Sequence, residues 1–193
     1  MKIKITFTEP ILGTWPADPQ VAEKYIASKA PDAGTITDEI AATSVEEVTE
    51  KSMTIFPRGE TGPILYDYQI KGFFKDACGM LARVKGTESS KIKAYKKIID
   101  GLIFPEPRMI PLTVAGEIGN CQRPIRAQTA QGERVSLANS EELPAGTTAE
   151  FSVNCLDPAH EKLVLEWLDY GKLRGLGQWR NSGKGRFTFE VLG

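Results

Sequence analysis

Apolar positions recur with two different periods along the chain, and these periods predict its elements. Residues 2–7 alternate polar and apolar side chains, which is the pattern of a half-buried strand. Over 67–84 the apolar residues instead fall on one face of a helix, with Asp67 as its predicted N-cap. A second helix is predicted over 90–99, with isoleucines inward and lysines outward.

The later part of the chain predicts mainly strands. Segment 102–114 reads as one strand at an edge or with a bulge, because three prolines interrupt it. Segment 123–156 reads as three strands, the last two joined by a Pro-Ala-Gly turn. A helix opened by an Asp-Pro pair is predicted over 157–175, and an alternating strand over 186–192. This order indicates an α+β protein built on an antiparallel sheet.

Charge is spread unevenly. Residues 17–50 hold eight acidic and two basic residues, a local charge of −6, whereas residues 51–193 hold sixteen acidic and twenty basic residues, a local charge of +4. The whole chain has a formal net charge of −1, so no global field drives unspecific binding to nucleic acid or membranes. We expect a single domain over 1–193 that carries an irregular acidic insertion at about 14–52.

Length, cysteine spacing and the lengths of the apolar runs further narrow the class of protein. The 193 residues suffice for one sizeable core. Three distant cysteines match neither a CxxC pair nor a metal-ligand spacing, which is typical of free thiols in a reducing compartment. The first residues do not resemble a signal peptide, and no apolar run is long enough for a membrane span. We therefore expect a cytoplasmic protein without a membrane partner, a cofactor or a bound metal.

Four segments carry, in order, the pattern of one known family. They are 2–13 (KIKITFTEPILG), 64–81 (ILYDYQIKGFFKDACGML), 125–153 (IRAQTAQGERVSLANSEELPAGTTAEFSV) and 175–187 (GLGQWRNSGKGRF). The chain resembles the RAMP superfamily, the repeat-associated proteins that form the crRNA-binding backbone of CRISPR effector complexes. The resemblance implies a ferredoxin-like fold related to the RNA-recognition motif, with helices on one face and a β-hairpin extension. The chain is also similar to small proteins encoded by bacteriophages and prophages.

The last of these segments is the first candidate binding site. Its glycines let backbone N–H groups approach an anion, its basic residues neutralise phosphates, and Trp179 offers a ring on which a base can stack. The alternative is a tight turn in which the tryptophan covers the core and the basic side chains are merely solvated. The candidate residues are Arg174, Gly175, Gly177, Trp179, Arg180, Asn181, Lys184 and Arg186.

Two further groups are candidates. Lys71 and Lys75 lie one helical turn apart, off the apolar face, and either contact phosphate or form a solvated face. Arg123, Arg126 and Arg134 alternate with glutamines in the β region, where they either contact nucleic acid or line an exposed hairpin.

Three functions remain open. The first is a non-catalytic binder of single-stranded nucleic acid, RNA rather than DNA, that self-associates as RAMP backbone proteins do. The second is a phage protein that binds a host-defence protein or a small nucleotide signal, suggested by the acidic insertion. The third is a metal-dependent ribonuclease using Asp18, Asp32 or Asp38, although the insertion matches no catalytic motif. The single histidine, His160, lies too late in the chain to match the histidine of catalytic RAMP relatives.

Overall fold

The computed structural model of the chain describes residues 1–18, 53–129 and 132–192. These residues form two compact units, which are described separately. The first unit consists of residues 1–11, 57–117 and 143–193, and the second of residues 12–56 and 118–142.

The first unit holds a seven-stranded sheet and three α-helices. Its sheet order is β12-β1-β11-β8-β6-β5, and β7 also pairs with β11. In chain order its elements are β1 (Lys2–Phe7), β5 (Arg58–Gly59), β6 (Gly62–Tyr66), α3 (Asp67–Leu81), the 3-10 turn η2 (Ser89–Lys91), α4 (Tyr95–Leu102), β7 (Ile103–Glu106), β8 (Met109–Thr113), β11 (Thr148–Cys155), η3 (Pro158–His160), α5 (Glu161–Arg174), η4 (Arg180–Ser182) and β12 (Phe187–Val191).

The core of this unit has ferredoxin-like topology. The chain runs from β1 through α3 and α4 to β7 and β8, returns along β11, and continues through α5 to β12. Strand β1 pairs antiparallel with both β11 and β12, and β11 pairs antiparallel with β7 and β8. This is the βαββαβ arrangement with the last strand beside the first. The predicted α+β, ferredoxin-like fold is therefore confirmed.

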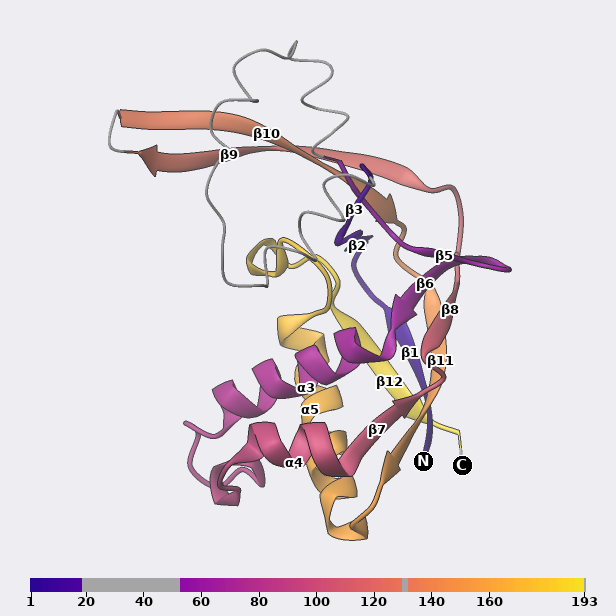
Figure 1. Cartoon of the computed structure of the whole chain (residues 1–193), viewed down its shortest axis with the longest axis vertical. Coiled ribbons are helices and arrows are strands. Elements are labelled where there is room, and N and C mark those ends of the chain that lie inside the picture. The colour runs from indigo at the N-terminus through magenta and orange to yellow at the C-terminus, as the bar shows by residue number, and fades with distance from the viewer. Residues whose placement is uncertain (19–52, 130–131, 193) are drawn as a thin grey trace. The chain divides into compact units, whose positions relative to one another are not determined.

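Alternation along the strands places the core between sheet and helices. In β1 the residues Ile3, Ile5 and Phe7 are buried, while Lys4 and Thr6 between them are only half-buried. Register sets Ile3 beside Phe151 and Ile5 beside Ala149 of β11, so one face of the sheet is apolar. Helices α3, α4 and α5 cover that face, as Figure 1 shows for this unit. Trp167 of α5 is fully buried there against Phe74 of α3, with ring centroids 5.4 Å apart.

The predicted helices form with shifted ends. Helix α3 begins at Asp67, but the N-cap is Tyr66, whose N–H donates to Gln69 Oε1 at 2.8 Å, so the prediction of Asp67 as N-cap is wrong by one residue. The helix ends at Leu81, and Val84 lies beyond it and is exposed.

The predicted second helix is divided. Residues 89–91 form a 3-10 turn and the α-helix starts only at Tyr95, because Ala94 adopts a left-handed backbone conformation with φ 53°.

The proline-rich segment forms two strands rather than one. Strand β7 ends at Glu106 and β8 begins at Met109. Strand β8 lies between β11 and β6, so it is not an edge strand. The remaining strand predictions hold, and the turn at Pro144–Gly146 is closed by a hydrogen bond from Thr147 N to Pro144 O.

The second unit contains a smaller sheet with order β2-β10-β4-β3, and β9 pairs with β10. Its carboxylate Glu141 is buried and accepts a hydrogen bond from Phe56 N at 2.8 Å. Its strands are β2 (Ile11–Leu12), β3 (Trp15–Pro16), β4 (Thr54–Ile55), β9 (Gly119–Thr129) and β10 (Gly132–Leu143).

The predicted acidic insertion falls mostly outside the described residues. Its first part differs from the irregular structure predicted, because Trp15–Pro16 pairs with β4 as strand β3. Residues 19–52, which include Asp32 and Asp38, lie outside the described part of the chain.

Candidate nucleic-acid interface

The segment from Gly175 to Arg186, here the C-terminal loop, connects α5 to β12. Its two ends touch through a hydrogen bond from Leu176 N to Gly185 O at 2.8 Å. Gly175 and Gly185 both have positive φ, at 75° and 73°. A Cβ on Gly185 would lie 1.8 Å from Leu176 O, so only glycine allows the ends to come this close.

The neck of the loop is attached to the segment that follows β1. Gly185 N donates to Pro10 O at 2.8 Å, and Thr8 N donates to Arg186 O at 2.8 Å. Leu176 is buried at the same place. Backbone hydrogen bonds therefore hold both ends of the loop in place.

The tip of the loop is a single 3-10 turn. Trp179 precedes it with a left-handed backbone, φ 54°, and its carbonyl accepts hydrogen bonds from Ser182 N and Ser182 Oγ. Gly183, at φ 94°, ends the turn. Trp179 is 45% exposed, so it does not cover the core as the alternative interpretation supposed. An exposed indole is suited to stacking on a base.

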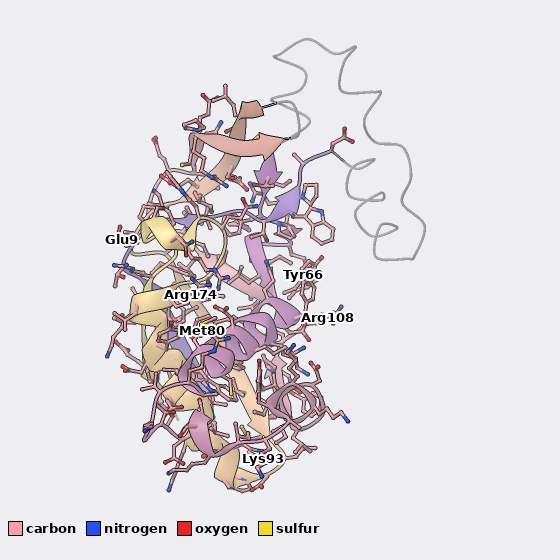
Figure 2. The ribbon with its side chains drawn as sticks, turned by 90° about the vertical axis from the view of Figure 1, so that its left-hand side faces the viewer. Glu9, Tyr66, Met80, Lys93, Arg108 and Arg174 are labelled. Atoms are coloured by element: carbon pink, nitrogen blue, oxygen red, sulfur yellow. The ribbon has the colours of Figure 1, made fainter. Side chains whose placement is uncertain are left out.

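Two arginines of this region share one carboxylate. Asp76 Oδ2 accepts from Arg174 Nε and from Arg180 Nη1, both at 2.8 Å. Arg174 Nη1 also donates to Asn181 Oδ1 at 3.1 Å, which joins the end of α5 to the loop tip. Figure 2 labels Arg174 close to α3, the helix that carries Asp76.

The two arginines keep Asp76 ionised. Burial by itself raises the pKa of this carboxyl group. The hydrogen bond from Arg174 and the positive charges of Arg180 and Arg174 outweigh burial, so the pKa of Asp76 lies below its ordinary value. The pKa of Arg174 is raised in turn, first by its hydrogen bond to Asp76. The cluster holds two positive charges against one negative charge at neutral pH.

The remaining candidates of the loop lie near its end. Arg186 is exposed and Lys184 is half-buried. A Cβ on Gly183 would lie 3.6 Å from the guanidinium carbon of Arg186, so this side chain extends along the tip. The loop thus groups Arg174, Arg180, Lys184 and Arg186 in one region of the first unit.

Lys71 and Lys75 face α4 instead. Lys71 Nζ donates to Asp100 O at 3.2 Å and lies 4.3 Å from the centre of the Phe104 ring. Lys75 Nζ pairs with Asp100 Oδ1 at 2.6 Å. The two lysines are therefore engaged in holding α3 to α4, and it is Asp76 on the same helix that faces the C-terminal loop.

The arginines predicted in the hairpin belong to the second unit. Arg123 is only 6% exposed and donates to Ser140 Oγ at 3.0 Å, so it does not lie on an exposed hairpin surface. Its neighbour across the ladder is Ala138. Arg126 and Arg134 lie on paired strands, opposite Val135 and Ala127, and their side chains are outside the described part of the structure.

No group of three or more histidine, cysteine, aspartate or glutamate side chains is gathered as for a metal ion within 1–18, 53–129 and 132–192. In the same residues no helix combines the length and apolar character that crossing a membrane requires. The three cysteines are free thiols, as predicted.

Sequence reasoning missed Asp76 and an aromatic cluster at the start of α3. Tyr66 and Tyr68 stack with ring centroids 5.2 Å apart, and the Arg108 guanidinium lies 5.8 Å over the Tyr68 ring. Figure 2 labels Tyr66 and Arg108 at this end of α3. Arg108 also pairs with Asp67 at 3.2 Å. The only signal in the sequence was two tyrosines separated by one residue, which by themselves indicate nothing about the arginine forty residues later.

The sequence matches no protein-family model and no curated protein. Among solved structures it is similar to a chain of the type III-B Cmr-beta complex bound to cognate target RNA, with 13% identity and a TM-score of 0.48. That similarity covers 98% of this chain but 58% of the other, so this chain spans less than two thirds of that protein. A chain of a type IV-B CRISPR complex is similar at 14% identity with a TM-score of 0.49, covering 98% of this chain and 89% of that one.

Proposed function

We propose that this protein is a non-catalytic, RAMP-like binder of single-stranded nucleic acid, with RNA preferred over DNA. The observation that carries the proposal is the C-terminal loop, whose backbone is fixed at its neck and whose tip presents basic side chains and an exposed Trp179. Positive charge binds the phosphate backbone and an exposed aromatic ring stacks on unpaired bases. Self-association along the strand is part of the proposal.

The charge distribution supports a local binding site rather than general coating. The chain as a whole carries a net charge of −1, so it has no field that attracts nucleic acid from all sides. Two of the four basic residues of the loop region, Arg174 and Arg180, share one carboxylate, that of Asp76, so the loop region keeps a local positive charge. Binding should therefore depend on these few residues.

The test measures binding of a fluorescently labelled single-stranded RNA by anisotropy over a series of salt concentrations. The wild-type affinity should fall steeply with salt, and the double variant Arg180→Ala/Lys184→Ala should bind roughly tenfold or more weakly. If two phosphate contacts are lost, the slope of log affinity against log salt should fall by about 1.4, at about 0.7 per contact for single strands.

The matched control is Lys71→Ala/Lys75→Ala. It also removes two positive charges, but from lysines that contact Asp100 of α4. It should change affinity much less than the loop variant. Salt-independent binding, or equal losses in the two double variants, would contradict the assignment of binding to the loop. Single-stranded DNA and duplex RNA of the same sequence test the preference for single-stranded RNA. If the purified protein instead carried a stoichiometric protein or small nucleotide in place of nucleic acid, the alternative function of an interaction protein would be favoured.

A further inference from the structure

At Asp76, one carboxylate oxygen accepts hydrogen bonds from two guanidinium groups. Arg174 Nε and Arg180 Nη1 both lie 2.8 Å from Asp76 Oδ2. The two arginines come from the last residue of α5 and from the loop tip, and Asp76 comes from α3. The shared oxygen therefore holds close together two positive charges that would otherwise repel each other.

The orientation of the arginine side chains in this cluster is also fixed. Arg174 has a second partner, Asn181 Oδ1 at 3.1 Å, so its guanidinium plane is set by two acceptors. The side chains of Asp76, Arg174 and Arg180 are 23%, 26% and 29% exposed, so they are neither sealed in the core nor free in solvent. A ligand at the surface can reach such groups without unfolding the loop.

The cluster retains binding capacity after these contacts. Each guanidinium group has five N–H donors, and Asp76 and Asn181 use only a few of them. One carboxylate neutralises one of the two positive charges. What remains is a net positive charge with several N–H donors in a fixed arrangement, and planar N–H pairs match the oxygens of a phosphate group.

We propose that Arg174 and Arg180, joined by Asp76, form a binding site for a single backbone phosphate, in which Asp76 is a positioning residue. The inference rests on the proposed function for the identity of the physiological ligand, a phosphodiester of single-stranded nucleic acid. Asp76 does not touch the phosphate. It orders the two arginines before binding, so less side-chain freedom is lost on association.

Whether Asp76→Asn weakens or tightens RNA binding distinguishes a positioning role of Asp76 from a purely electrostatic one. Removing this negative charge makes the loop region more positive, so electrostatics alone predicts tighter RNA binding. Positioning predicts the opposite, a roughly tenfold weaker affinity, because two long side chains lose their common anchor. Asp100→Asn on α4 is the matched control: it adds the same charge and breaks the ion pair with Lys75, but leaves the arginine pair intact. It should bind as tightly as wild type or slightly more tightly.

Asp76→Glu should recover part of the affinity that Asp76→Asn loses, whereas a general structural defect would not distinguish the two. Arg174→Lys/Arg180→Lys keeps both charges and tests the guanidinium geometry if Asp76→Asn fails to fold; it should also weaken binding severalfold. Affinity in Asp76→Asn equal to or tighter than that of Asp100→Asn would overturn the positioning role.

A second readout does not need nucleic acid. In the wild-type protein, titration with inorganic phosphate should shift the Nε–Hε NMR signals of Arg174 and Arg180 together in the millimolar range, and Asp76→Asn should abolish the common shift. Common phosphate shifts without RNA binding would sustain this site and reject the proposed function. Absence of the shifts in wild type would reject the phosphate site even if RNA binds elsewhere on the chain.

Discussion

Gly185 shows at the residue scale how much of the C-terminal loop depends on one missing side chain. Its φ of 73° lies in the left-handed region, and a Cβ there would lie 1.8 Å from Leu176 O. The atom that would be struck belongs to the backbone and cannot rotate away. The closed neck of the loop therefore needs glycine at this position.

Gly185→Ala should lower the free energy of unfolding by about 2 kcal/mol or more, because backbone strain adds to the clash. Gly101→Ala is the control, since Gly101 lies in α4 with nothing within 4 Å of its added Cβ. This change should be neutral or stabilise by up to about 1 kcal/mol, as alanine favours a helix over glycine. Urea denaturation measures both, and equal effects would contradict a steric role for Gly185.

Asp76 makes stability depend on pH in a defined direction. Its pKa in the folded protein is below the ordinary value of 3.8, so its contribution is complete above that value and is lost as the pH falls through the folded pKa. The difference in unfolding free energy between wild type and Asp76→Asn should be constant near neutral pH and shrink below about pH 4. Denaturant titrations over a pH series measure it. If the difference in unfolding free energy between the two proteins instead shrank as the pH was raised, the ionised carboxylate of Asp76 would not be its cause.

At the scale of elements, a polar network ties the connection between α3 and α4 to α5. The Glu166 carboxylate accepts hydrogen bonds from Glu88 N at 2.7 Å and from Ser89 N at 2.9 Å. Ser89 Oγ donates to Glu166 and accepts from Trp167 Nε1 at 2.9 Å. Ser89 and Trp167 are both completely buried. This network stabilises the 3-10 turn that divides the predicted second helix.

Ser89→Ala should therefore lower the free energy of unfolding by about 1–3 kcal/mol, because the buried indole N–H loses its acceptor. Ser90→Ala provides the comparison, since Ser90 is exposed and its hydroxyl donates to Thr87 O at the surface. That neighbour should change stability by less than about 0.5 kcal/mol. Tryptophan fluorescence during denaturation reports the transition, and similar midpoints for the two variants would argue against the network.

For the whole molecule, the first unit has a central sheet region and weaker edges. Strand β11 pairs with β1, β7 and β8, and β1 lies between β11 and β12. Strand β5 has only two residues and lies at the end of the sheet order. Strands with partners on both sides and a buried face open only with most of the unit.

Hydrogen exchange tests this order. Peptides from β1 and β11 should exchange last, at a rate governed by global unfolding, whereas amides around β5 should exchange earlier through local opening. Mass spectrometry of peptides after timed exposure to deuterated buffer gives the rates. Exchange of β1 or β11 as fast as that of β5 would be inconsistent with the central position of these strands.

Local patterns in the sequence determined much of the first unit. The alternation of residues 2–7 and the helical spacing over 67–81 arise because one face of each element must leave water, so these patterns report structure without reference to distant residues. The glycines of the C-terminal loop also pointed to a sharp turn between a helix and a strand. The order of such elements predicted an α+β protein, and the ferredoxin-like arrangement was implied by the family resemblance.

Only the tertiary structure decided which charges act together. Asp76 meets arginines 98 and 104 positions later, and Ser89 meets Glu166 77 positions later. Lys71 and Lys75 looked solvent-exposed in the sequence but contact Asp100, and Arg123 looked exposed but is buried against Ser140. A hydrophobic period says which face of an element is buried. It does not say which polar partner a charged side chain will contact, because that depends on how separate elements pack. The candidate site was therefore defined only by the packing of the C-terminal loop against α3.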